Sequence, residues 1–117
     1  MNKPLSPSAH GVADYLSSAT FAAAPSLLSM PPAAATLARS LGASYAGLSL
    51  ATAYPLGAAK LVPFPMHLTM DFVMAPVIAA APWLFGFLES KTARNFFLAM
   101  AGVTAIVTSL TQRRPAA

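Results

Sequence analysis

The segment His67-Leu-Thr-Met-Asp71-Phe72, followed by Ala-Ala-Ala-Pro at residues 79–82, has an earlier counterpart in the same chain. The counterpart is His10-Gly-Val-Ala-Asp14-Tyr15, followed by Ala-Ala-Ala-Pro at residues 22–25, at an offset of 57 residues. The whole chain has only two histidines and three acidic residues, so chance does not readily place both histidines and two of the acids in register. This pattern indicates an internal duplication, which must be settled before the fold is predicted.

Each copy is expected to form a helical hairpin. Prolines and polar residues divide the chain into four helical segments, at about residues 8–30, 33–54, 65–88 and 92–111. The second helices of the two copies also resemble each other, since Ala-Arg at 38–39 and Ala-Gly at 46–47 recur at an offset of 55 residues. We therefore predict repeat one at 7–55, a linker at 56–64 and repeat two at 65–112, with both hairpins in the same orientation.

The composition favours a membrane protein. Of the 117 residues, 56% are hydrophobic and only 9% are charged, which is too few charges to cover the surface of an ordinary soluble domain. Segments of about 20 apolar residues are long enough to cross a bilayer. The predicted fold class is therefore all-α, with four transmembrane helices arranged as two tandem hairpins.

The same composition limits partners and location. The net charge of +4 comes from scattered basic residues without a basic patch, so nucleic acid is not expected as a partner. The expected partners are the lipid bilayer and either further copies of the chain or a larger membrane complex. The basic residues Lys3, Lys60, Arg113 and Arg114 outnumber those at the other helix ends, which favours a bacterial inner membrane protein with both termini in the cytoplasm.

Two His-Asp pairs are the candidate functional residues. His10 and Asp14 lie four residues apart and therefore on one face of the first helix, and His67 and Asp71 repeat this on the third helix. Both pairs are expected at the same depth, where the symmetry of the repeats can bring them face to face. The chain has no cysteine, so a thiolate metal site is excluded.

Three interpretations of the pairs remain open. In the first, they have a packing and capping role near helix N-termini. In the second, all four residues bind a metal such as zinc, iron or manganese, or His10 and His67 hold a haem iron while each aspartate orients its histidine. In the third, the pairs exchange protons or handle a small ion.

With its duplication, which spans most of the chain, the sequence resembles the SPW-repeat proteins, a family of small bacterial membrane proteins. The resemblance rests on His67, Asp71 and Ala-Pro-Trp-Leu-Phe-Gly-Phe at 81–87, together with Lys-Leu-Val-Pro at 60–63. The first repeat departs from the Ser-Pro-Trp signature, since it has Ala-Pro-Ser at 24–26. The resemblance implies a four-helix membrane protein of paired hairpins, and it implies no activity or catalytic residues.

The function predicted first is a structural or accessory membrane module that packs with itself or with a larger complex. Binding of a metal or haem by the two His-Asp pairs is the alternative, and proton or small-ion handling is a further one. The chain offers no recognisable nucleophile, oxyanion site or phosphate loop, so the sequence does not indicate an enzyme.

Overall fold

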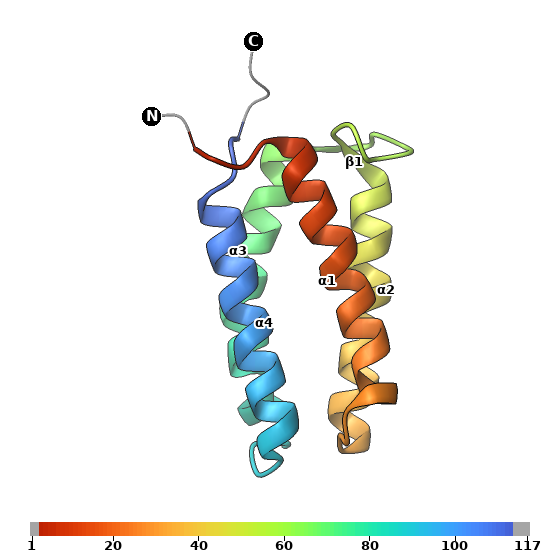
Figure 1. The fold of residues 1–117 in the computed structure, drawn as a ribbon, viewed down its shortest axis with the longest axis vertical. Helices are drawn as coiled ribbons and strands as arrows, with labels where there is room; N and C mark the ends of the chain where they lie inside the picture. The colour runs from red at the N-terminus through yellow and green to blue at the C-terminus, as the bar shows by residue number, and fades with distance from the viewer. Residues whose placement is uncertain (1–2, 114–117) are drawn as a thin grey trace.

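The computed structural model describes residues 3–113 and consists of four helices in an antiparallel bundle (Figure 1). The helices are α1 (Pro7–Leu27), α2 (Pro32–Ala51), α3 (Phe64–Leu84) and α4 (Lys91–Ser109). Two strands of two residues each, β1 (Thr52–Ala53) and β2 (Val62–Pro63), form a short parallel pair after α2 and before α3. The segments just before α1 and just after α4 meet at the end of the bundle where α1 and α3 begin, since Leu5 pairs with Thr111 there.

Local sequence signals explain where the helices begin. The side chain of Ser6 accepts a hydrogen bond from the amide of Ala9, and Pro7 follows it at the first helical position, where a missing N–H costs nothing. Ser90 caps α4 in the same way through the amide of Ala93. α2 and α3 also begin near prolines, without a side-chain cap.

The helices end earlier than predicted. α1 ends at Leu27, two residues after Pro25, and α3 ends at Leu84, two residues after Pro82. A proline lacks the N–H that would continue the helical hydrogen bonds, so its position near a helix end shortens the helix there. After α3 the chain turns at Gly86, whose φ of 75° favours glycine.

In the structure, the offset between equivalent residues of the two hairpins differs between their first helices and their second helices. The bounds of α1 and α3 differ by 57 residues at both ends, as the sequence repeat does, whereas α4 begins 59 residues after α2 (91 − 32). The offset of 55 noted in the sequence therefore places α4 one helical turn out of register. Residues four apart lie on one helix face, so an alignment at either offset places buried positions of α2 opposite buried positions of α4. The sequence pattern alone therefore did not distinguish the two offsets.

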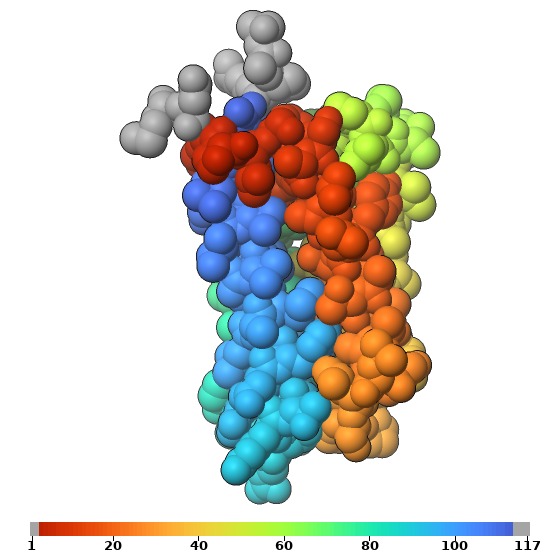
Figure 2. Space-filling model, in the orientation of Figure 1, coloured from red at the N-terminus to blue at the C-terminus, as the bar shows by residue number. Residues whose placement is uncertain are grey.

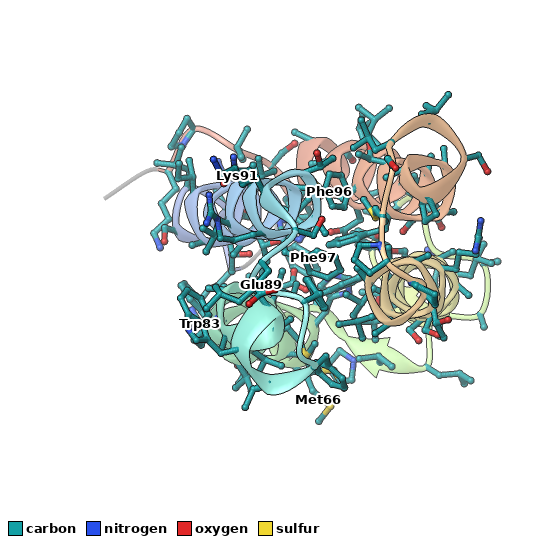
Figure 3. The ribbon with its side chains drawn as sticks, turned by 90° about the horizontal axis from the view of Figure 1, so that it is seen from below. Met66, Trp83, Glu89, Lys91, Phe96 and Phe97 are labelled. Carbon is teal, nitrogen blue, oxygen red and sulfur yellow. The ribbon has the colours of Figure 1, made fainter. Side chains whose placement is uncertain are left out.

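The helices pack around a common axis, with the most extensive contacts within each hairpin (Figure 3). The larger apolar core fills the half of the bundle nearest the α1–α2 and α3–α4 connections and includes Phe21, Ile78 and Phe97. Figure 3 shows Phe97 directed into the bundle, while Trp83 and Met66 point away from it. A smaller apolar cluster of Tyr54, Phe64 and Leu68 closes the other end.

The predicted all-α class with four helices agrees with the structure, but the prediction that all four helices cross a membrane is wrong. Of the described helices, only α3 is long and apolar enough to span a bilayer, with a mean hydropathy of 1.4 over its most apolar window. One such helix is weak evidence for a span, since core helices of other proteins have the same character and 39% of this window is buried. The other helices also contain glycine, serine, threonine and charged residues, which lower their mean hydropathy although the apolar fraction of the whole chain is high.

The predicted location is corrected for the same reason. Multi-pass insertion in a bacterial inner membrane, with both termini in the cytoplasm, depended on four spanning helices, and three of them do not qualify. Arg114, which contributed to the predicted orientation, lies outside the described residues.

We predict that Gly42 sets the distance between α1 and α2. A Cβ atom at this position would lie 2.8 Å from the backbone oxygen of Ser18 and 2.8 Å from the backbone nitrogen of Ala22. Substitution Gly42→Ala should therefore lower the free energy of unfolding by about 1–3 kcal/mol, measured by urea denaturation. The matched control is Gly47→Ala, because nothing lies within 4 Å of a Cβ there and the gain in helix propensity, up to about 1 kcal/mol, should stabilise the protein. Equal effects of the two substitutions would contradict this packing.

Candidate metal centre

The two His-Asp pairs meet inside the bundle, between the two apolar clusters. His10 and Asp14 come from α1, and His67 and Asp71 come from α3. All four side chains are buried, with exposed fractions of 1%, 8%, 0% and 2%. One ligand atom from each residue lies within 4.8 Å of the ligand atoms of the other three. This arrangement is a compact set of two imidazoles and two carboxylates.

Each imidazole faces both carboxylates through its Nε2 atom. His10 Nε2 lies 3.1 Å from Asp14 Oδ1 and 2.9 Å from Asp71 Oδ2. His67 Nε2 lies 3.0 Å from Asp14 Oδ2 and 3.2 Å from Asp71 Oδ2. Neither oxygen lies in hydrogen-bonding direction from His67 Nε2, which is therefore close to two carboxylates without a hydrogen-bond partner among the described residues.

A threonine from the opposite hairpin holds the other nitrogen of each ring. Thr111 Oγ1 lies 2.8 Å from His10 Nδ1, and Thr52 Oγ1 lies 2.7 Å from His67 Nδ1. Each threonine hydroxyl also donates to the main-chain carbonyl four residues earlier, at 2.6 Å in both cases. Short extended pairings position these threonines, since Thr52 pairs with Val62 and Thr111 pairs with Leu5.

These contacts determine where the imidazole protons lie. A hydroxyl has one proton, and the proton of Thr52 and that of Thr111 are both committed to a backbone carbonyl. The threonine oxygen must therefore accept from an Nδ1–H in each histidine. Nε2 is then either protonated, which makes the ring an imidazolium, or presents its lone pair to the carboxylates.

The surroundings of the two aspartates differ. The Tyr54 hydroxyl donates to Asp14 Oδ2 at 3.1 Å, and the Tyr54 ring stacks on Phe64 at 5.4 Å between ring centroids. Asp71 Oδ2 faces both histidines, whereas Asp71 Oδ1 is buried without a hydrogen-bond partner among the described residues. Both oxygens of Asp14 therefore have polar partners, whereas one oxygen of Asp71 has none among the described residues.

The pKa values of the metal-free centre follow from this geometry. Burial by itself would lower the pKa of His67, but the attraction of the nearby Asp14 and Asp71 carboxylates outweighs it and raises the pKa to about 9. The same balance raises the pKa of His10. Burial would raise the pKa of Asp14, but its contacts with the two histidines lower it below the usual range. Without a metal, the cluster therefore favours two imidazolium rings and ionised Asp14.

A haem does not fit this centre. The cavity beside His10, Asp14 and Asp71 has a volume of about 20 Å³, enough for about one water molecule. The aspartates, moreover, occupy the space beside both Nε2 atoms, where a porphyrin bound through His10 and His67 would lie. The ligand set suits a bare metal ion instead.

The sequence identified the four charged residues, and the structure brings all four together. Three further residues of the centre were not predicted from the sequence: Thr52 and Thr111, which fix the ring nitrogens, and Tyr54, which donates a hydrogen bond to Asp14. The two threonines are 59 residues apart, so an alignment of the second helices at that offset would have revealed them as a repeated pair.

No family model matches this chain, and no match was found among curated proteins or among solved structures. The resemblance to the SPW-repeat proteins therefore stays a prediction that rests on the quoted residues.

The metal-free protein should be most stable in mildly acidic solution. The raised pKa values of His10 and His67 contribute stability below the ordinary histidine value of 6.5, and the contribution of His67 is lost as the pH rises through about 9. The lowered pKa of Asp14 contributes stability above 3.8, which is lost as the pH falls further. Urea denaturation with a chelator present should give a maximum free energy of unfolding between these limits and a decline from pH 7 to 9.

The control for this pH dependence is His67→Gln, which removes the group with the pKa of about 9. The decline between pH 7 and 9 should be smaller in this variant than in the parent. An identical decline in both proteins would show that other groups cause it.

Proposed function

We propose that this protein binds one divalent first-row transition-metal ion between α1 and α3. The ligands are Nε2 of His10 and His67 and the carboxylates of Asp14 and Asp71. Imidazole nitrogen suits zinc, iron, nickel and copper, and carboxylate oxygen also suits manganese. Calcium and magnesium prefer all-oxygen sites, so the two imidazoles disfavour them.

The observation that carries this proposal is the orientation of the two histidines. In metal sites, a ligating imidazole commonly donates its second N–H to a fixed acceptor, which sets the tautomer and aims the lone pair at the metal. Thr52 and Thr111 are such acceptors, and both Nε2 atoms lie within 3.2 Å of oxygens of the two carboxylates. Two lone pairs and two carboxylates in contact repel one another unless protons or a cation lie between them.

Charge balance supports a divalent ion. A buried cluster with net charge is costly, because little solvent is present to stabilise it. Two imidazolium rings and two carboxylates sum to zero, and so do two neutral imidazoles, two carboxylates and one divalent cation. Metal binding thus replaces two protons by one ion without changing the buried charge, and affinity should fall at low pH.

A structural role is the second candidate. The metal-free cluster of two imidazolium rings and two carboxylates has no net charge, which favours this role. In that form the contacts between His10 and Asp71 and between His67 and Asp14 join α1 to α3 without any metal. The proton-handling alternative stays a prediction. Metal binding is preferred because His67 Nε2 lacks a well-directed hydrogen bond that an imidazolium would make.

Zinc titration of the chelator-treated protein tests the proposal. We expect one Zn²⁺ per chain, with release of two protons, measured by calorimetry in buffers of different ionisation enthalpy. His67→Gln and Asp71→Asn each remove a ligand atom and should weaken binding by at least about 100-fold. Thr52→Val, which removes the acceptor of His67 Nδ1–H, should weaken it by about 10- to 100-fold.

The matched control is Glu89→Gln, which changes the third acidic residue of the chain at an exposed position. It should leave zinc affinity unchanged. Absence of stoichiometric zinc binding at pH 8, with the parent protein folded, would leave the structural role as the function of the cluster.

A further inference from the structure

A small cavity adjoins the centre between two of the helices. The cavity of about 20 Å³ lies between α1 and α4, with Asp71 of α3 and Tyr45 of α2 also in its wall. Figure 2 shows a narrow opening between the atoms of α1 and those of α4 in the upper half of the bundle. The cavity therefore connects the buried centre with the surface along the α1–α4 seam.

Two buried polar atoms of the cavity wall residues lack partners. Asp71 Oδ1 and the Tyr45 hydroxyl are both buried without a hydrogen-bond partner among the described residues. Leaving such buried groups unpaired destabilises the folded protein. Asp71 Oδ1 only accepts, whereas Tyr45 can donate, because burial and the charges of Asp71 and Asp14 raise its pKa and keep the hydroxyl protonated.

These two groups define the chemistry of the occupant. It must donate a hydrogen bond to Asp71 Oδ1, accept one from the Tyr45 hydroxyl and fit a space of about one water molecule. Small anions such as halides are disfavoured, because they offer no proton to the carboxylate. Water and hydroxide meet all three conditions.

The two repeats have side chains of different size at the positions that line the cavity. Ser17 and Thr104 line it, and their counterparts in the other repeat are Met74 (17 + 57) and Tyr45 (104 − 59). Met74 is partly buried and packs against the larger apolar core, so a larger side chain occupies the equivalent position on the α2–α3 side. Small side chains at two positions therefore account for the opening beside α1 and α4.

We propose that the metal centre is an open one, which keeps a coordination position for a single exchangeable water or hydroxide in this cavity, held between Asp71 and Tyr45. This inference rests on the proposed metal binding. Metal sites with catalytic roles typically keep such a solvent position, whereas structural sites are closed by protein ligands. A solvent ligand here also provides the partners that Asp71 Oδ1 and the Tyr45 hydroxyl lack.

Electron spin echo spectroscopy of the Cu²⁺-loaded protein in D₂O tests the inference. Copper binds such nitrogen and oxygen ligands most strongly of the divalent first-row ions. The remote nitrogens of the bound imidazoles modulate the echo and report metal binding by histidine. Deuterons of a coordinated water add a separate modulation, which we expect in the parent protein.

The deciding variant is Ser17→Met, which copies Met74 and fills the cavity. It should keep the imidazole modulation and lose the deuterium modulation of bound water. Thr20→Met, an exposed position one turn further along α1, is the matched control and should keep both. Thr104→Tyr, which copies Tyr45, fills the cavity from α4 and replaces Ser17→Met if that variant does not fold.

Each outcome has a distinct meaning. Imidazole modulation without coordinated deuterons in the parent, or bound water that persists in the cavity-filling variants, would overturn the open centre while leaving metal binding intact. Absence of imidazole modulation in the parent would overturn both proposals.

Discussion

Two carboxylates and two imidazoles share one small volume in the interior of this bundle, and their charges must cancel there. Asp14 and Asp71 lie within 3.2 Å of the histidine Nε2 atoms, in a region that apolar side chains close at both ends. Either two protons or one divalent cation achieves the balance. Every helix contributes to this arrangement, because α1 and α3 provide the charged groups while Thr52 and Thr111, at the ends of α2 and α4, orient the rings.

The duplication explains how so few charged residues build a centre. Each hairpin provides one His-Asp pair, and each also provides the threonine that binds the histidine of the other hairpin. The site therefore requires both copies, and neither hairpin alone contains it. The two copies also differ in sequence beside the centre. Ser17 and Thr104 are small and line the cavity between α1 and α4, whereas their counterparts Met74 and Tyr45 are large.

The sequence predicted the four helices and the charged residues of the centre, because the spacing of four within each pair and the offset of 57 between pairs depend on chain position alone. It did not predict the register of α4, since Ala38 and Ala93 suggested an offset one helical turn away. The membrane prediction failed because glycine, serine, threonine and charged residues lower the mean hydropathy of the individual helices, and among the described helices only α3 reaches that of a bilayer span. The lack of a hydrogen-bond partner for Asp71 Oδ1 among the described residues depends on side-chain packing and could not be predicted from spacing.

The most direct test of this account is the protonation state of the ring nitrogens of His10 and His67, measured by long-range ¹H–¹⁵N correlation in metal-free and Zn²⁺-loaded protein. The account predicts protonated Nδ1 atoms in both forms, and Nε2 atoms that are protonated without metal near pH 6 and carry no proton when zinc is bound. Neutral rings protonated at Nε2 in the metal-free protein, unchanged on addition of zinc, would contradict both the threonine-directed tautomer and the metal centre built on it.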